Sequence, residues 1–236
     1  GLFMGTMSVI NIPTPKQMSV YSQVVYQNTP YNKVKEKIVQ GEVGNPIPRK
    51  VGEKSPIKYV FYVIKENRTY DQVLGDMKEG NGDPRLTLFG ENITPNQHAL
   101  ARNFVLLDNF YVDGEVSMDG HNWTMGAYAT DFLEKSWVSS YGGKGGSYDG
   151  EGNRKVANNK GGFFWDHAKK AGVSFRSYGE FVDNYKANIP VLEGNFCKYF
   201  TGYNNGVMDT TRFYQWKRDF DSLLALNSVP QFNTVR

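Results

Sequence analysis

Apolar and β-forming residues gather in five stretches of the chain, and segments with helical spacing separate most of them. Residues 59–64 (YVFYVI) and 104–112 (FVLLDNFYV) contain few polar interruptions and lack strict alternation. Such runs are typical of strands buried on both faces, as in the centre of a parallel sheet. The other stretches predict strands at residues 173–178 and 230–236 and a separate short strand at residues 2–12.

Helical spacing of apolar residues predicts helices in the second part of the chain. They span residues 71–76, 95–103, 121–137, 163–171 and 210–226. We expect Ala99, Leu100 and Phe104 to face inward and His98 to lie on the surface. His167 is expected to be a structural histidine. The repeated strand–helix–strand order favours an α/β fold, a mostly parallel sheet with helices on both faces.

The connecting segments differ in composition. Residues 19–40 predict two short helices broken at residues 28–30 (NTP), and residues 41–56 are a Gly/Pro-rich loop. Residues 139–162 form a long Gly-rich loop, and loops of this length are usually functional lids or disordered. The last strand has no following helix and the strand at residues 2–12 has no partner. We therefore expect an incomplete domain preceded by an orphan strand.

Charge and cysteine content exclude several classes of protein. The net charge is +3, and residues 1–57 hold seven Lys or Arg against three Glu. This excess is too dilute for a nucleic-acid footprint, so no nucleic-acid partner is expected. No stretch approaches the ~20 apolar residues of a transmembrane segment. The single Cys197 excludes a disulfide within the chain and a cysteine-based zinc site.

Polar clusters follow two of the predicted strands. Glu66 and Asn67 come shortly after the strand at residues 59–64, and residues 113–122 (DGEVSMDGHN) follow the strand at residues 104–112. Ligands of open α/β sheets bind beyond the carboxyl ends of the strands. Adjacent strands would bring the two clusters together, although a strand ending in a solvated turn would show the same pattern.

These side chains have the chemistry of a metal and phosphate site. Glu66, Asn67 and Ser117 offer hard oxygen ligands, which suit a divalent cation. Ser117 lies just before a predicted helix, where free N–H groups and the helix dipole favour a phosphate or a nucleophilic oxygen. His121 could donate a hydrogen bond to a phosphate oxygen or a leaving group. The alternative is that Ser117 or Asp119 is simply an N-cap.

The motif at residues 66–71 (ENRTYD) resembles the E-N-R-[ST]-[FY]-D motif of the phosphoesterase family of bacterial phospholipases C and acid phosphatases, within the alkaline phosphatase superfamily. The likeness covers most of residues 57–236. It is strongest to bacterial chains in which an amino-terminal β-propeller precedes an alkaline-phosphatase-like domain. Three segments carry that likeness: GNGDPRLTLFGENITPNQHALARNF, NFYVDGEVSMDGHNW and FRSYGEFV.

The resemblance implies a domain plan and a set of site residues. Residues 1–15 would be the closing strand of an upstream β-propeller, residues 16–56 a connector, and residues 57–236 the N-terminal half of a phosphoesterase domain. Glu66 and Asn67 would bind a divalent metal ion. Ser117 would be the nucleophile and a neighbour of the metal, and His121 a phosphate contact. The substrate would be a phosphate ester.

One departure from the family concerns the rest of the metal site. The family completes that site with an adjacent Asp pair and a His in a later segment, which is not present before Arg236. We therefore expect a downstream half of the domain in the full-length protein, and an inactive fragment without it. The family also implies a periplasmic or cell-surface location in a bacterium.

Two other functions remain open from the sequence. The chain could be a non-catalytic cell-surface binding module with a degenerate hydrolase fold. The intact Glu66, Asn67 and Ser117 argue against degeneracy. A nucleotide-binding domain would carry a Gly-rich phosphate fingerprint after its first strand, and none follows residue 64.

Overall fold

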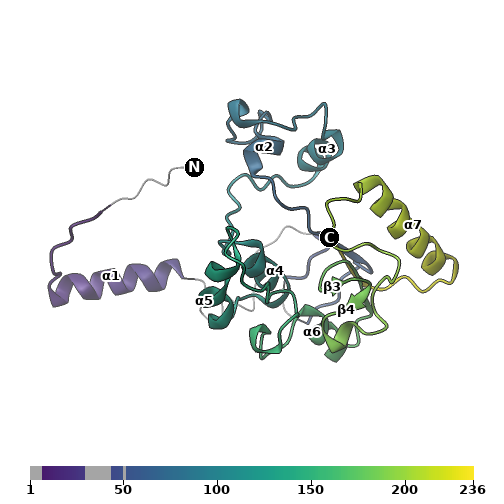
Figure 1. Ribbon diagram of the computed structural model, residues 1–236. Helices are drawn as coiled ribbons and strands as arrows, with labels where there is room; N and C mark the ends of the chain where they lie inside the picture. Colours follow the sequence, from purple (N-terminus) through teal and green to yellow (C-terminus); the bar gives the residue numbers. More distant parts are fainter. Residues whose placement is uncertain (1–6, 30–43, 50–51) are drawn as a thin grey trace. The chain divides into compact units, whose positions relative to one another are not determined.

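The computed structural model describes residues 7–29, 44–49 and 52–236 (Figure 1). The chain divides into two compact units, Gly1–Lys58 and Tyr59–Arg236. The described part of the first unit contains helix α1, Pro15–Asn28, which begins with a capping box between Thr14 and Gln17. This helix confirms the first of the two helices expected before residue 40. The second falls in residues 30–43, outside the described residues.

The strand expected at residues 2–12 is not present where the structure describes it. Residues 7–12 have no regular secondary structure, and Met7, Val9, Ile10 and Ile12 are exposed. The prediction is therefore wrong for these residues, because apolar composition does not supply the neighbouring strand that backbone pairing needs. Residues 1–6 lie outside the described residues.

A three-stranded parallel sheet organises the second unit. Its strands are β1 (Val60–Val63), β5 (Phe232–Val235) and β2 (Phe175–Tyr178), in the order β1-β5-β2. Val60 and Phe175 both align with Phe232, and the three strands end level with one another. The mostly parallel sheet expected from the sequence is confirmed in this coarse form.

The strand order corrects one expectation. The strand at residues 59–64 was predicted to be central and buried on both faces, but β1 is an edge strand of the sheet. Its four residues are between 42% and 63% exposed. The central position belongs to β5. An apolar run indicates a strand, whereas its burial depends on which neighbours the chain places beside it.

Helix α6, Phe164–Lys170, covers one face of the sheet. Trp165 and Ala168 belong to the same buried cluster as Phe175 and Phe232. At roughly 25 cal/mol per Å² of apolar surface, a fully buried aromatic side chain contributes about 2 kcal/mol or more. This cluster therefore fixes α6 against β2 and β5.

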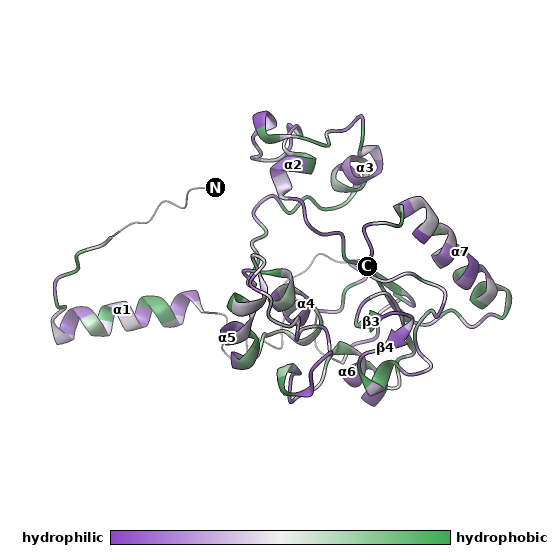
Figure 2. Cartoon of the chain, viewed as in Figure 1, coloured by the Kyte–Doolittle hydropathy of each residue, from purple (hydrophilic) through white to green (hydrophobic). Residues whose placement is uncertain are grey.

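Helix α7, Asp209–Ala225, packs on the opposite face and carries both hydrophilic and hydrophobic residues (Figure 2). Asp219 accepts two hydrogen bonds of 2.6 Å from Arg176 and one of 2.9 Å from the Tyr178 hydroxyl. Since Arg176 and Tyr178 alternate with Phe175 along β2, they point away from α6. Helices therefore lie on both faces of the sheet, as expected.

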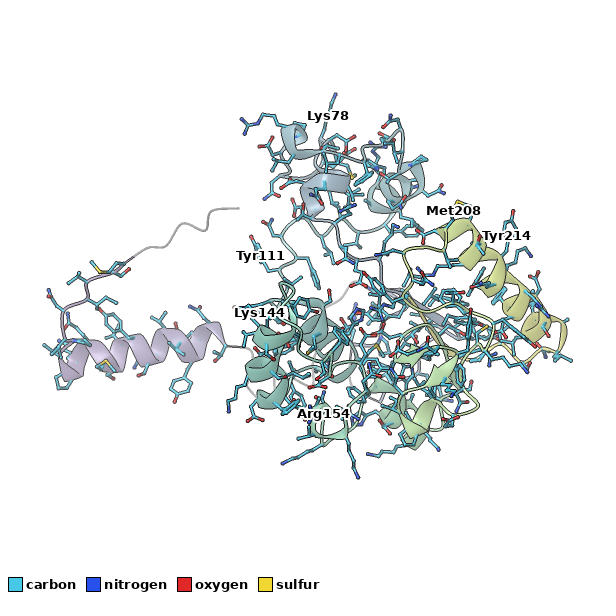
Figure 3. The ribbon with its side chains drawn as sticks, in the orientation of Figure 1. Lys78, Tyr111, Lys144, Arg154, Met208 and Tyr214 are labelled. Atoms are coloured by element: carbon cyan, nitrogen blue, oxygen red, sulfur yellow. The ribbon has the colours of Figure 1, made fainter. Side chains whose placement is uncertain are left out.

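Residues 104–112 do not form the expected strand. The segment has no strand pairing, and Phe104, Val105, Phe110 and Tyr111 are each more than 70% exposed. Figure 3 shows Tyr111 projecting from this segment. The prediction is wrong because the segment pairs with no described strand: Phe110 and Tyr111 line a cavity together with Tyr62 of β1, but no ladder of backbone hydrogen bonds joins them to that strand.

The remaining elements include helices that the sequence predicted and, in addition, short 3-10 helices and a short antiparallel strand pair that it did not predict. They are α2 (Tyr70–Leu74), η2 (Pro84–Leu86), α3 (Pro95–Asn103), α4 (Ser117–Gly126), α5 (Asp131–Ser140), η3 (Lys155–Ala157), β3 (Val182–Asp183), β4 (Lys186–Ala187) and η4 (Pro190–Leu192). The single helix expected at residues 121–137 is divided between α4 and α5. Helix α4 ends at Gly126, and Ala127 follows it as a left-handed C-cap with a φ of +62°.

Two histidines differ from their expected environments. His98 is buried and bonded to Asp76, while Leu100 and Phe104 are exposed, so α3 turns its polar side inward. His167 is exposed on α6 rather than enclosed. Among the described residues, no helix is both long and apolar enough to cross a membrane.

Candidate functional site

The carboxyl ends of the three parallel strands meet at one edge of the sheet. Glu66 follows β1, Glu180 follows β2, and Arg236 follows β5 directly. The Arg236 Nη2 atom lies 3.4 Å from Glu66 Oε1, and both side chains line the same cavity. The site therefore lies at the edge where open α/β sheets place their ligands, as the position of Glu66 predicted.

His121 joins this edge from helix α4. Its side chain is 3% exposed, and its Nδ1 atom lies 2.8 Å from Glu180 Oε1. Its Nε2 atom lies 3.2 Å from Glu66 Oε2 and 3.9 Å from Glu151 Oε1, without the alignment of a hydrogen bond. Three carboxylates thus surround one imidazole.

Glu151 reaches the site from the Gly-rich segment at residues 139–162. Gly150 touches helix α4 so closely that a Cβ atom there would lie 2.6 Å from Met118 Cγ. The Asn188 amide donates a 2.8 Å hydrogen bond to the Glu151 carbonyl. The segment is therefore not wholly a solvent-exposed lid, because its middle is buried against α4 and carries a site carboxylate.

The Glu151 carboxylate is held by two donors. The Tyr148 hydroxyl donates a 2.6 Å hydrogen bond to Oε1, and Arg236 donates to Oε2. Arg236 also stacks its guanidinium over the Tyr203 ring, with 5.0 Å to the centroid. These contacts leave Glu151 with a single orientation, in which Oε1 faces His121.

Burial and close charges shift the pKa values of these groups in opposite directions. Burial alone would lower the pKa of His121, but its contacts with Glu180 and Glu66 outweigh burial and raise it to about 10. The contact with His121 lowers the pKa of Glu66 despite partial burial. Burial raises the pKa of Glu180 in spite of His121. The surrounding carboxylates thus favour a positive charge on the His121 imidazole at the centre of the cluster.

All four site residues predicted from the sequence line one cavity. Glu66, Asn67, Ser117 and His121 border a cavity of about 680 Å³. The first three also border a neighbouring cavity of about 640 Å³, which Arg236 lines as well. The structure therefore brings together side chains from the end of β1 and the start of α4.

Ser117 is the first residue of helix α4 and not its cap. Val116 occupies the N-cap position, and its side chain makes no capping hydrogen bond. The Met118 N–H donates to the Tyr141 hydroxyl at 3.0 Å. The N-cap alternative is therefore wrong for both Ser117 and Asp119, and the Ser117 side chain borders the cavities instead.

Other residues of the ENRTYD motif have structural roles. Thr69 caps helix α2 in a capping box with Gln72, and Asp71 accepts a 2.7 Å hydrogen bond from the Asp83 N–H. Asn67 has φ of +66°, a left-handed conformation that asparagine tolerates better than most residues. The turn after β1 is thus shaped by the motif, with Glu66 and Asn67 at the cavity.

The buried carboxylates and imidazole could hold a metal ion. His121, Glu151 and Glu180 each offer one ligand atom, and these atoms lie within 4.8 Å of one another. His121 Nε2 and Glu180 Oε2 are buried and have no hydrogen-bond partner among the described residues. Imidazole nitrogen and carboxylate oxygen are common ligands of divalent metals, so the donor set fits one.

Glu151, Glu180 and Arg236 were not predicted as site residues. Glu180 follows the strand at residues 173–178, so the strand-end rule that identified Glu66 could have found it. Arg236 is the last residue of the strand predicted at residues 230–236, so it too lies at a carboxyl end of a strand. Glu151 carries no such signal, since it lies far from any strand end in the sequence.

Comparison with known proteins adds no relative: no family model, no curated protein and no solved structure matches the chain. The resemblance to the phosphoesterase family, and the roles it implies, therefore remain expectations.

Proposed function

We propose that this chain is part of a metal-dependent phosphoester hydrolase in which Ser117 is the nucleophile. One observation supports this most: Glu66, Asn67, Ser117 and His121 line a common cavity at the carboxyl edge of a parallel sheet. Their side chains come from two segments about 50 residues apart in the sequence, and nothing in their local structure requires them to meet.

The proposed reaction has two steps. Ser117 Oγ forms a bond to the phosphorus of a bound phosphate ester, the bond to the alcohol breaks, and the alcohol leaves with a proton. Water then cleaves the phosphoseryl group, which releases phosphate and restores the hydroxyl. Arg236 lines the cavity and offers positive charge to phosphoryl oxygens. The N-terminus of the ten-residue helix α4 favours negative charge beside Ser117.

A metal ion held by Glu66 and Asn67 would neutralise phosphoryl charge and lower the pKa of the serine hydroxyl. His121 was expected to contact the phosphate, and that role stays a prediction. Its surroundings argue for a different role. The carboxylates of Glu66, Glu151 and Glu180 lie within 3.9 Å of the His121 ring nitrogens, and their negative charges would repel a phosphate anion.

A second candidate is a non-catalytic binding module. Arg236 bonds to both Glu66 and Glu151, so a protein cation already neutralises carboxylates that a metal would otherwise engage. A site balanced in this way could bind an anionic ligand without chemistry.

The first candidate is tested by hydrolysis of an aryl phosphate monoester and a bis-aryl diester with added divalent metals. The assay uses the longest natural chain containing this sequence, since the resemblance implies further ligands after residue 236. Ser117→Ala should lower kcat by about 10³-fold or more, because it removes the nucleophile.

Ser139→Ala is the matched control. Ser139 is exposed on α5, donates to the Ser136 carbonyl, and does not itself line either cavity. Its turnover should equal that of the wild type. Unchanged turnover in Ser117→Ala would assign the nucleophile elsewhere, and no turnover by the wild type with any metal would favour the binding module.

A further inference from the structure

We propose that His121 Nε2, Glu66 and Glu151 bind one divalent metal ion, and that Glu180 positions the imidazole for it. The proposal rests on the proposed function only in sharing Glu66. In this proposal the metal ion lies at His121 and Glu151 rather than at Asn67 and Ser117. His121 is then a metal ligand and not a phosphate contact.

The contact between His121 and Glu180 fixes the orientation of the imidazole ring. The Nδ1 atom lies 2.8 Å from Glu180 Oε1, in a pocket where Glu180 is fully buried. A histidine that donates Nδ1–H to a carboxylate presents Nε2 outward as a ligand, and metal-binding histidines commonly have this outer carboxylate. Glu180 therefore fixes both the tautomer and the orientation of His121.

Arg236 orients the two ligand carboxylates from the far side. It engages Oε1 of Glu66 and Oε2 of Glu151. The opposite oxygens, Glu66 Oε2 and Glu151 Oε1, then face His121 Nε2 at 3.2 Å and 3.9 Å. Ligand atoms that are each about 2.1 Å from one ion lie roughly 3.0–3.4 Å apart. The distance from Nε2 to Glu66 Oε2 already suits a shared ion, whereas Glu151 Oε1 would have to move inward.

The atom facing the two carboxylates has no other partner. His121 is 3% exposed, and its Nε2 atom makes no hydrogen bond within the described part of the chain. Buried polar atoms are nearly always paired, and an unpaired one indicates a missing water or ion. A metal ion at this position would take the place of the Nε2 proton, which would pass to solvent.

Charge balance favours a doubly charged cation. Glu66, Glu151 and Glu180 contribute three negative charges and Arg236 contributes one positive charge, so the cluster with a neutral imidazole carries −2. One divalent ion neutralises it. A nitrogen ligand beside carboxylates favours Zn²⁺ or Mn²⁺ over Ca²⁺, which prefers oxygen ligands alone.

Isothermal titration of the 236-residue protein with Zn²⁺ alone, and separately with Mn²⁺ alone, tests the proposal. One equivalent should bind to the wild type. His121→Gln and Glu151→Gln should each weaken binding by at least about tenfold, and Glu180→Gln by about 10- to 100-fold. His167→Gln is the control for incidental histidine binding, because His167 is exposed on α6, and it should bind as the wild type does.

X-ray absorption of the zinc-loaded His167→Gln protein gives a readout that does not depend on folding of the site variants. Imidazole scattering from one histidine with oxygen neighbours is expected. Absence of a bound ion, or wild-type affinity in His121→Gln, would overturn the proposal. Binding lost in Asn67→Ala but kept in His121→Gln would also overturn it and support the outer metal position. If the metal binds as proposed but the protein hydrolyses no phosphate ester, the metal site stands and only the proposed function is refuted.

Discussion

Two buried histidines in the second unit are each held by a carboxylate. His121 pairs with Glu180 at the sheet edge, and His98 pairs with Asp76 beside helix α3. Only His121 has a ring nitrogen without a hydrogen-bond partner among the described residues, since His98 Nδ1 lies 2.9 Å from the Thr94 carbonyl. The fully bonded pair is therefore structural, while the partly bonded one remains open to a ligand.

The His98–Asp76 pair predicts a pH dependence of stability. Burial opposes the charged imidazole, but hydrogen bonds to Asp76 and Thr94 raise the pKa of His98 above its usual value. The His98 contact lowers the pKa of Asp76. The stabilisation from His98 is complete below its unfolded pKa of about 6.5 and is lost as the pH rises through the folded pKa. The stabilisation from Asp76 is present above a pH of about 3.9, the unfolded pKa of aspartate, and is lost as the pH falls through the folded pKa of Asp76.

Hydrogen exchange of the α3 amides should therefore be slowest between about pH 4 and 6.5, after correction for intrinsic exchange. NMR titration of the His98 imidazole checks the direction of the shift. His98→Gln should remove the loss of protection above pH 6.5. An imidazole that titrates below 6.5 would contradict the prediction.

At the scale of elements, the division between α4 and α5 is the main departure from helical periodicity. Apolar spacing continued through residues 121–137, yet Ala127 adopts a left-handed conformation and Thr130 caps α5 by accepting a hydrogen bond from the Leu133 N–H. Left-handed geometry costs a residue with a Cβ atom about 1 kcal/mol or more. The turn is thus maintained by the packing of both helices.

Ala127→Gly should stabilise the protein, because glycine adopts this conformation without the Cβ penalty and Ala127 is exposed. The net gain is about 0.5–1 kcal/mol after the entropy of the unfolded glycine, or about 2 °C in Tm. Thermal unfolding measures it. Ala225→Gly, at an exposed position within α7, should not raise Tm, and a lower Tm for Ala127→Gly would refute the left-handed turn.

At the scale of the whole molecule, the second unit leaves an apolar segment uncovered. Residues 104–112 contain several large apolar side chains that are more than 60% exposed, and the edge strand β1 has no neighbour on its outer side among the described residues. Exposed apolar patches and free strand edges promote association.

We therefore expect the isolated chain to self-associate at micromolar concentrations. Val105→Lys should weaken association by about tenfold, equivalent to about 1.4 kcal/mol, because it places a charge in the exposed segment. Light scattering over a concentration series provides the measurement. Leu226→Lys, at a similarly exposed position beside α7, is the matched control, and a monomeric wild type at every concentration would contradict the expectation.

The sequence alone determined most helices, three of the strands and the first residues of the site. The spacing of apolar residues and the helix caps are local properties of the sequence. Helices α3, α6 and α7 therefore begin and end within one or two residues of their predicted limits. Glu66 and Asn67 were found because polar residues that follow an apolar run mark the carboxyl end of a strand.

Only the tertiary structure decided which strand is central, which histidine is enclosed, and which carboxylates surround His121. These outcomes depend on contacts between residues far apart in the chain, such as Glu151 with Arg236. Neither the spacing of apolar residues nor a short sequence motif encodes such a contact. The same apolar pattern produced paired β1 and unpaired residues 104–112, because a strand exists only where another backbone accepts its hydrogen bonds.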